Sequence, residues 1–192
     1  MIGYARSAVW KRTCLNPWTD KEGKDVAQSN FNDLEALEIA INIEKRGEVF
    51  YRQAISLVPN DDVRRMLEEL AEQERDHAVT FQKIYHELSG KKQDFDDTYL
   101  YDPEVAAYLR VMSENTIFPS DSRQQEVIDG LQNISDVFAI SIQAEKDSIL
   151  FYTEMTINAK YTDAKEAFRR LMKEEKKHLI DLQTKWNEFK LP

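Results

Sequence analysis

The sequence has little cysteine, glycine and proline, and each shortage excludes a class of protein. Its single cysteine, Cys14, excludes an intrachain disulfide, a four-cysteine zinc or iron site, and an iron–sulfur cluster held by one chain. Five glycines and five prolines in 192 residues are too few for a turn-rich all-β protein. The composition therefore favours an all-α protein.

The sequence also lacks long apolar runs and an excess of positive charge. No uncharged run approaches the roughly 18–20 residues that cross a bilayer, and the first residues, MIGYARSAVWKRTC, lack the apolar core of a secretory signal. The formal net charge of −9 argues against nucleic acid or an anionic membrane as the main partner. We therefore expect a cytoplasmic protein with no nucleic-acid partner and no membrane partner.

What is present is helical periodicity over residues 31–192, which predicts one all-α domain. Residues 1–30 show no sustained periodicity and predict an irregular N-terminal arm. Asn32 or Asp33 is expected to cap the first helix, and Asp61 or Asp62 the second. The long helices are expected at 33–58, 61–89, 135–159 and 162–189.

The connections between these helices predict their arrangement. Pro59 leaves a very short join between the first two helices, which makes them an antiparallel hairpin. Residues 91–133 are too long for a tight turn and contain a short helix after Pro103. The prediction is a four-helix bundle, in which two hairpins are joined by a long crossover containing that short helix.

The two hairpins are related by an internal repeat of 101 positions. The segment NIEKRGEVFYRQA aligns with QAEKDSILFYTEM, and both contain Glu-Lys, four further residues and Phe-Tyr. The repeated pairs are Glu44 and Glu145, Phe50 and Phe151, Tyr51 and Tyr152, Leu70 and Leu171, Glu74 and Glu175, and His77 and His178.

Polar residues interrupt the apolar stripe of each helix. Glu74 and His77 lie three residues apart, on one face of a helix, where a buried carboxylate is costly unless it is paired or bound to a metal. The repeat gives Glu175 and His178 the same places. The predicted metal ligands are Glu44, Glu74, His77, Glu145, Glu175 and His178.

This ligand set fits two divalent ions. Its four carboxylates balance the charge of two M²⁺ ions, and each ion can take one neutral imidazole. Carboxylate and imidazole ligands favour iron or manganese over softer metals. Two iron ions are the first choice because their redox change can be used, with manganese second and zinc third.

These residues carry a resemblance to a known family. The chain resembles the ferritin-like di-iron carboxylate proteins over residues 33–189, and is most similar to rubrerythrins that lack a rubredoxin domain. The resemblance implies that Glu74 and Glu175 bridge two irons, with Glu44 and Glu145 as terminal ligands. Its motifs are Glu44, Glu74-Arg75-Asp76-His77, Glu145 with Glu-Lys-Asp-Ser-Ile-Leu-Phe-Tyr, and Glu175-Lys176-Lys177-His178.

The resemblance also implies a function. Members of the family reduce hydrogen peroxide to water, or oxidise Fe²⁺ with peroxide or oxygen. Without a rubredoxin module, this chain would need an external electron donor such as a rubredoxin-like protein. The resemblance further implies a homodimer. The alternatives are an iron-handling protein with little turnover and a structural bundle without metal.

The chain departs from the rubrerythrin pattern at one position. Typical rubrerythrins carry an additional third-helix carboxylate where this chain has Ser148, which puts full peroxidase competence in question. Glu48, one turn after Glu44, is a candidate substitute. Tyr51 and Tyr152 are candidate hydrogen-bond donors to ligand carboxylates, as in the family.

Overall fold

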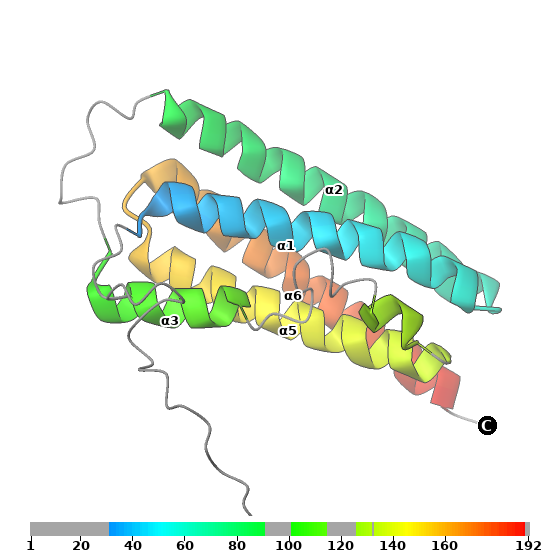
Figure 1. Cartoon of the computed structure of the whole chain (residues 1–192). Coiled ribbons are helices and arrows are strands. Elements are labelled where there is room, and N and C mark those ends of the chain that lie inside the picture. Colours follow the sequence, from blue (N-terminus) through cyan, green and yellow to red (C-terminus); the bar gives the residue numbers. More distant parts are fainter. Residues whose placement is uncertain (1–30, 91–100, 115–125, 132, 191–192) are drawn as a thin grey trace, which may run out of the picture.

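Four long helices form the bundle in the computed structural model, which describes residues 31–90, 101–114, 126–131 and 133–190 (Figure 1). The predicted arm at residues 1–30 lies outside these ranges. A 3-10 turn, η2 (Ile55–Leu57), follows α1, so the first α-helix ends at Ala54, four residues before the predicted boundary. The helices are α1 (Asp33–Ala54), α2 (Asp61–Ser89), α3 (Pro103–Glu114), α5 (Ile134–Asn158) and α6 (Thr162–Lys190).

Asparagine caps the beginning of three helices. The Asn32 side chain accepts hydrogen bonds from two backbone N–H groups of α1, as expected. Asn60 caps α2 in the same way, so the prediction of Asp61 or Asp62 was wrong. Asn133 caps α5 and forms a capping box with Asp136. In each case the cap is the residue whose extended backbone turns its side chain back onto the first helical turn.

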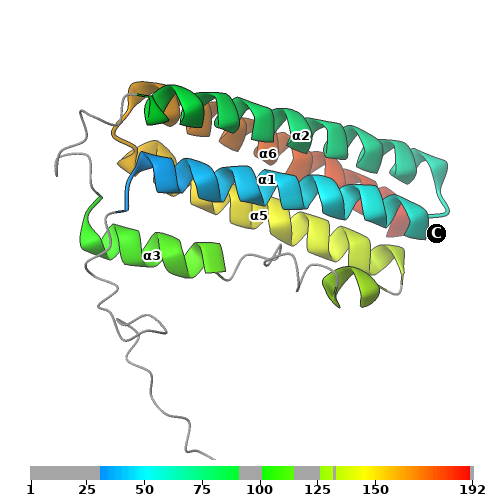
Figure 2. The same ribbon diagram turned by 45° about the horizontal axis from the view of Figure 1, so that its top comes forward.

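The predicted hairpin arrangement is confirmed. Helix α1 packs along α2 and α5 packs along α6, while α2 also contacts α6 and α1 contacts α5 (Figures 1 and 2). The predicted short helix is α3, which lies beside the bundle near the beginning of α1. A helical turn at residues 126–129 lies near the opposite end, where α5 begins.

A buried carboxylate anchors the beginning of α1. The Asp33 side chain accepts hydrogen bonds from the backbone N–H groups of Lys160 and Tyr161, in the turn between α5 and α6. It also accepts one from the Tyr101 hydroxyl, 2.6 Å away. Asp33 therefore ties the first hairpin to the second hairpin and to the crossover at one end of the bundle.

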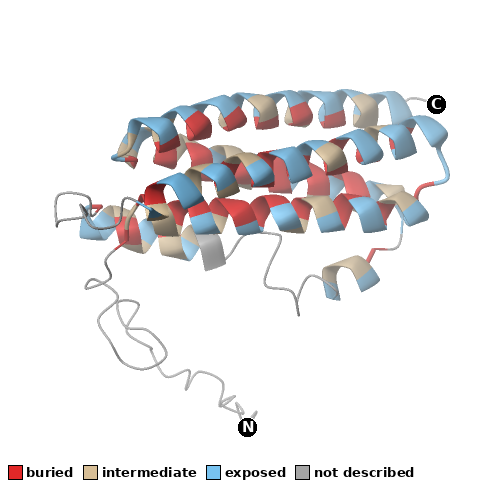
Figure 3. Ribbon diagram, turned by 90° about the horizontal axis from the view of Figure 1, so that it is seen from above, coloured by how far each residue is buried: buried red, intermediate tan, exposed pale blue. Residues whose placement is uncertain are grey.

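The inward faces of the helices are buried along the whole bundle (Figure 3). Their apolar residues form two clusters. One contains Leu37, Phe81, Tyr152 and Phe168, and the other contains Tyr51, Leu67, Phe138 and Leu182. Each fully buried large side chain stabilises the fold by about 1.5–3 kcal/mol. None of the described helices has a stretch apolar enough to span a membrane.

Candidate metal centre

Six ionisable side chains meet in the interior of the bundle, and they are the six predicted ligands. Helix α1 contributes one glutamate and α5 another, while α2 and α6 each contribute a glutamate and a histidine. Each of the six is at most 5% exposed to solvent. The buried set is Glu44, Glu74, His77, Glu145, Glu175 and His178.

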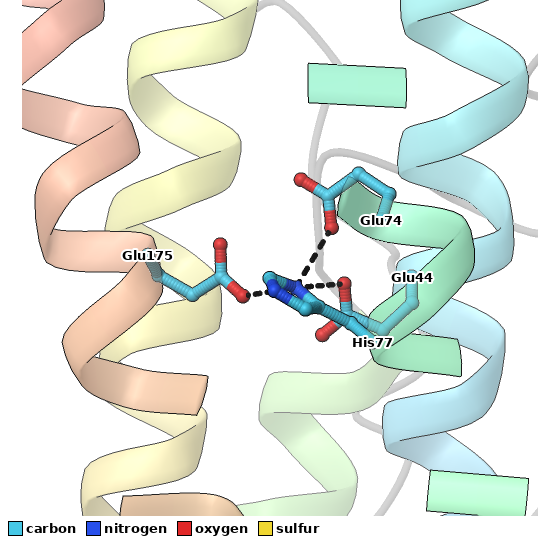
Figure 4. A group of neighbouring side chains, drawn as sticks. All are labelled: Glu44, Glu74, His77 and Glu175. Atoms are coloured by element: carbon cyan, nitrogen blue, oxygen red, sulfur yellow. Dashed lines mark ion pairs between the residues drawn. The ribbon is translucent and has the colours of Figure 1, made fainter. Parts of the chain in front are cut away.

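The six side chains form two overlapping groups of four. One group is Glu44, Glu74, His77 and Glu175, drawn in Figure 4, and the other replaces Glu44 and His77 by Glu145 and His178. Within each group, one potential ligand atom per residue lies within 4.8 Å of all the others. Glu74 and Glu175 belong to both groups, so they occupy the position that a bridging ligand between two ions requires.

Each bridging candidate directs one oxygen to each histidine. Glu175 Oε1 lies 2.9 Å from His77 Nδ1, and its Oε2 lies 2.9 Å from His178 Nδ1. For Glu74, Oε2 is 3.6 Å from His77 Nδ1 and Oε1 is 3.8 Å from His178 Nδ1. Ligand atoms about 2.1 Å from one octahedral ion lie roughly 3 Å apart when adjacent and 4.2 Å when opposite. The observed spacing falls in that range.

The terminal candidates complete the two groups. Glu44 Oε2 lies 3.5 Å from His77 Nδ1, and Glu145 Oε2 lies 3.7 Å from His178 Nδ1. The two imidazole rings are nearly parallel, with centroids 5.5 Å apart and an angle of 13° between their planes. This arrangement places two equivalent ligand groups side by side.

Two buried atoms in the centre, His77 Nδ1 and Glu175 Oε1, have no hydrogen-bond partner in the part of the chain that the structure describes. They lie 2.9 Å apart, but the contact is not aligned as a hydrogen bond. Buried polar atoms are rarely left unpaired, because each costs about 1–3 kcal/mol. Both atoms would be satisfied by a cation between them, so the donor set fits a metal.

The outward nitrogen of each imidazole is held by the opposite hairpin. His77 Nε2 lies 3.0 Å from Glu174 Oε2 on α6, and His178 Nε2 contacts Gln73 Oε1 on α2. A carboxylate oxygen or amide oxygen can only accept, so Nε2 of each ring donates the hydrogen. When the imidazole is neutral, this fixes the tautomer in which Nδ1 carries the lone pair that can bind a metal.

Two buried tyrosines also reach across to the opposite hairpin. The Tyr51 hydroxyl of α1 donates to Glu145 Oε1 of α5 at 2.5 Å, and the Tyr152 hydroxyl of α5 donates to Glu44 Oε1 of α1. Both tyrosines are at most 1% exposed. Each leaves the other carboxylate oxygen of its partner free for an ion.

Glycine makes room for one bridging carboxylate. Gly47 is buried on α1, and a Cβ atom at this position would lie 3.3 Å from Glu74 Cγ and 3.4 Å from Glu74 Cδ. Any larger residue would therefore press on the Glu74 side chain. The position equivalent to Gly47 in the second hairpin is Ser148, another small buried residue.

In the metal-free protein, protons occupy the ligand set. Burial raises the pKa of Glu74 well above its usual value and that of Glu145 to about 8. For His178, burial alone would lower the pKa, but hydrogen bonds to Glu145 and Glu175 outweigh burial and raise it to about 10. For Glu175, burial is likewise outweighed, and the two adjacent histidines lower its pKa to about 2.

Glu48 lies apart from the six clustered residues. Its carboxylate pairs with Arg52 on the same helix at 2.9 Å, its side chain is 23% exposed, and it belongs to neither group of four. Its supporting role in catalysis stays a prediction.

The sequence analysis overlooked Gly47, Gln73 and Glu174. The internal repeat pairs Gln73 with Glu174, which directly precede Glu74 and Glu175, so this pair could have been found from the sequence.

Comparisons with known proteins agree with this geometry. The family model described as rubrerythrin matches residues 35–184. No curated protein matches the chain. A crystal structure from Thermotoga maritima, described as a ferritin-like diiron-carboxylate protein, is 26% identical, with a TM-score of 0.59; the match covers 82% of this chain and 95% of that one. The predicted ferritin-like fold is thereby confirmed.

Proposed function

Because this chain belongs to the rubrerythrin family, we propose that it is a di-iron oxidoreductase that reduces hydrogen peroxide, or oxidises Fe²⁺, with electrons from an external donor. The observation that carries the proposal is the pair of overlapping groups that share Glu74 and Glu175. A mononuclear site would need no such duplication.

The ligand set is suited to a redox pair of ions. One iron would be held by Glu44, Glu74 and His77, and the other iron would be held by Glu145, Glu175 and His178. The two shared glutamates, Glu74 and Glu175, would contact both irons. Two Fe²⁺ ions held there would supply the two electrons that convert one hydrogen peroxide and two protons into two water molecules.

The residues around the ligands keep the carboxylates oriented and the site dry. Burial, with the nearby charge of Glu145 and Glu44 respectively, raises the pKa of Tyr51 and Tyr152 well above the usual value, so both hydroxyls keep their protons. As permanent donors, they hold one oxygen of each terminal carboxylate. The apolar clusters exclude bulk water on both sides of the site.

The test begins with metal analysis of protein purified without chelators, where we expect about two irons per chain. His178→Ala should lower the iron content well below two, because it removes a ligand from one group. The matched control is His86→Ala, since His86 is an exposed residue of α2 outside both groups. Full loading of His178→Ala would contradict the ligand assignment.

The activity is tested by mixing the reduced protein with hydrogen peroxide under anaerobic conditions. Rapid oxidation, followed by repeated turnover with a rubredoxin-like donor, is the result that supports the oxidoreductase. One slow, stoichiometric oxidation would instead support an iron-handling protein with little turnover. Such low turnover would fit the presence of Ser148 where typical rubrerythrins carry an additional carboxylate. Protein without bound metal would leave only a structural bundle.

A further inference from the structure

The two histidines of the metal centre differ in the group that holds their outward nitrogen. Glu174 Oε2 lies 3.0 Å from His77 Nε2, whereas His178 Nε2 contacts the amide oxygen of Gln73. Positions 73 and 174 are equivalent in the internal repeat. One imidazole therefore donates to a carboxylate and the other to a neutral amide.

The tyrosine contacts and the facing carboxylates are repeated in the two halves, although His178 Nδ1 is hydrogen-bonded to Glu175 Oε2 whereas His77 Nδ1 is not hydrogen-bonded in the described part of the chain. Each terminal glutamate accepts from a tyrosine of the opposite hairpin, since Tyr152 donates to Glu44 and Tyr51 to Glu145. Each histidine faces the same two bridging candidates through Nδ1. Among these supporting contacts, the difference in charge is confined to the pair at positions 73 and 174.

The charge of Glu174 is positioned to act on His77 directly. Its Oε1 lies 3.9 Å from Arg170 Nε, which is 60% exposed, so this pairing is weak and screened by water. Its Oε2 contacts an imidazole that is only 4% exposed. A carboxylate that accepts the Nε2 hydrogen pushes electron density onto Nδ1 and makes it a stronger ligand, whereas an amide does so less.

We infer that Glu174 makes the two metal positions unequal, so that the ion held by His77 binds more tightly than the ion held by His178. Glu174 is a positioning residue, because it acts through His77 and touches neither ion. This inference rests on the proposed metal centre. Its consequence is ordered loading, with the His77 position filled first.

The first test measures stepwise Fe²⁺ binding under anaerobic conditions, in competition with a chromophoric chelator. Glu174→Gln makes both halves alike at this position and should weaken the tighter step about tenfold, the lower end of the effect of such supporting contacts on metal affinity. Glu166→Gln is the matched control. It removes the same charge from the exposed surface of α6 about 12 Å away along the helix, and should leave both steps unchanged.

The second test exchanges the two residues. The double variant Gln73→Glu with Glu174→Gln keeps the net charge and should reverse the order of loading. In this variant His178→Ala should abolish the tighter step, whereas in the original chain His77→Ala should do so. In the Co²⁺-loaded protein, Glu174→Gln should shift the Nε2–H proton resonance of His77 and leave that of His178 in place.

The outcomes separate this inference from the proposed function. Two binding steps of equal affinity in the original chain, or an unchanged tighter step in Glu174→Gln, would overturn the inference and leave the di-iron centre intact. Failure of the original chain to bind Fe²⁺ would overturn both. An unchanged order of loading in the exchanged variant would show that another difference between the hairpins sets it.

Discussion

At the scale of single residues, the centre depends on side chains that each leave one atom for an ion. The tyrosines occupy one oxygen of Glu44 and of Glu145, and Gln73 and Glu174 occupy the outward nitrogens of the histidines. Because the side chains of Glu44, Glu145, His77 and His178 are all buried, losing one supporting contact leaves a buried polar atom without its partner.

We predict that Tyr51→Phe destabilises the protein by about 1–3 kcal/mol, because the buried Glu145 oxygen loses its donor. Tyr152→Phe should cost a similar amount through Glu44. The measurement is urea-induced unfolding of the metal-loaded protein. Tyr85→Phe is the control, since the half-buried Tyr85 hydroxyl has no described hydrogen bond. Equal costs for Tyr51→Phe and Tyr85→Phe would contradict this account.

At the scale of helices, the boundaries are set by side-chain caps. The sequence around α2 offers Asn60, Asp61 and Asp62, all of which are favourable capping residues. The backbone decides between them. Asn60 has an extended conformation, with φ −85° and ψ 119°, whereas Asp61 and Asp62 already lie within the helix. Only Asn60 can direct its side chain to the free N–H groups of the first turn.

We predict that Asn60→Ala lowers the free energy of unfolding by about 1 kcal/mol, the usual cost of losing a cap. Asp61→Ala is the comparison, and it should cost only a few tenths of a kcal/mol, because Asp61 is exposed and its one ion pair among the described residues is with Arg64 at 3.4 Å. Chemical unfolding at neutral pH measures both. A larger loss for Asp61→Ala would restore the prediction made from the sequence.

At the scale of the whole molecule, the metal centre exists only where the two hairpins meet. Each histidine shares its hairpin with one terminal glutamate, but its outward hydrogen bond comes from the other hairpin. The tyrosine contacts cross in the same way. Assembly of the bundle and assembly of the site are therefore one event, and filling the site stabilises the whole fold.

We predict that the metal-free protein loses thermal stability as the pH rises from 7 to 9. The pKa values of Glu145, about 8, and His178, about 10, are above the ordinary values of 4.5 and 6.5. The folded state therefore holds protons that the unfolded chain has released, so raising the pH favours unfolding. In the loaded protein metal ions replace these protons, and the gap in Tm between the two forms should widen.

The control for this prediction is Glu145→Gln, which cannot ionise at that position. The decline in Tm between pH 7 and 9 should be shallower in the metal-free form of this variant. A metal-free original chain whose Tm is constant or rises over this range would contradict the assignment of protons to the buried set.

The sequence by itself determined the four helices, their pairing and the identity of the six clustered residues. These features are local or periodic: apolar spacing defines the buried face of a helix, and the repeat shows that the two hairpins share one design. A carboxylate on the buried face of a helix, such as Glu74 or Glu175, predicts that a cation offsets the cost of burying its charge. This prediction does not depend on which helix the buried face packs against.

Only the tertiary structure decided which groups support the ligands, because those contacts join residues about 100 positions apart. Periodicity did not distinguish Glu48, which turns towards Arg52, from Glu44, which turns inwards, because a small rotation of the helix separates the two outcomes. It also gave no sign that Gln73 and Glu174 reach across to the histidines, since both lie beside the buried stripe. Helix packing alone brings these side chains to the centre.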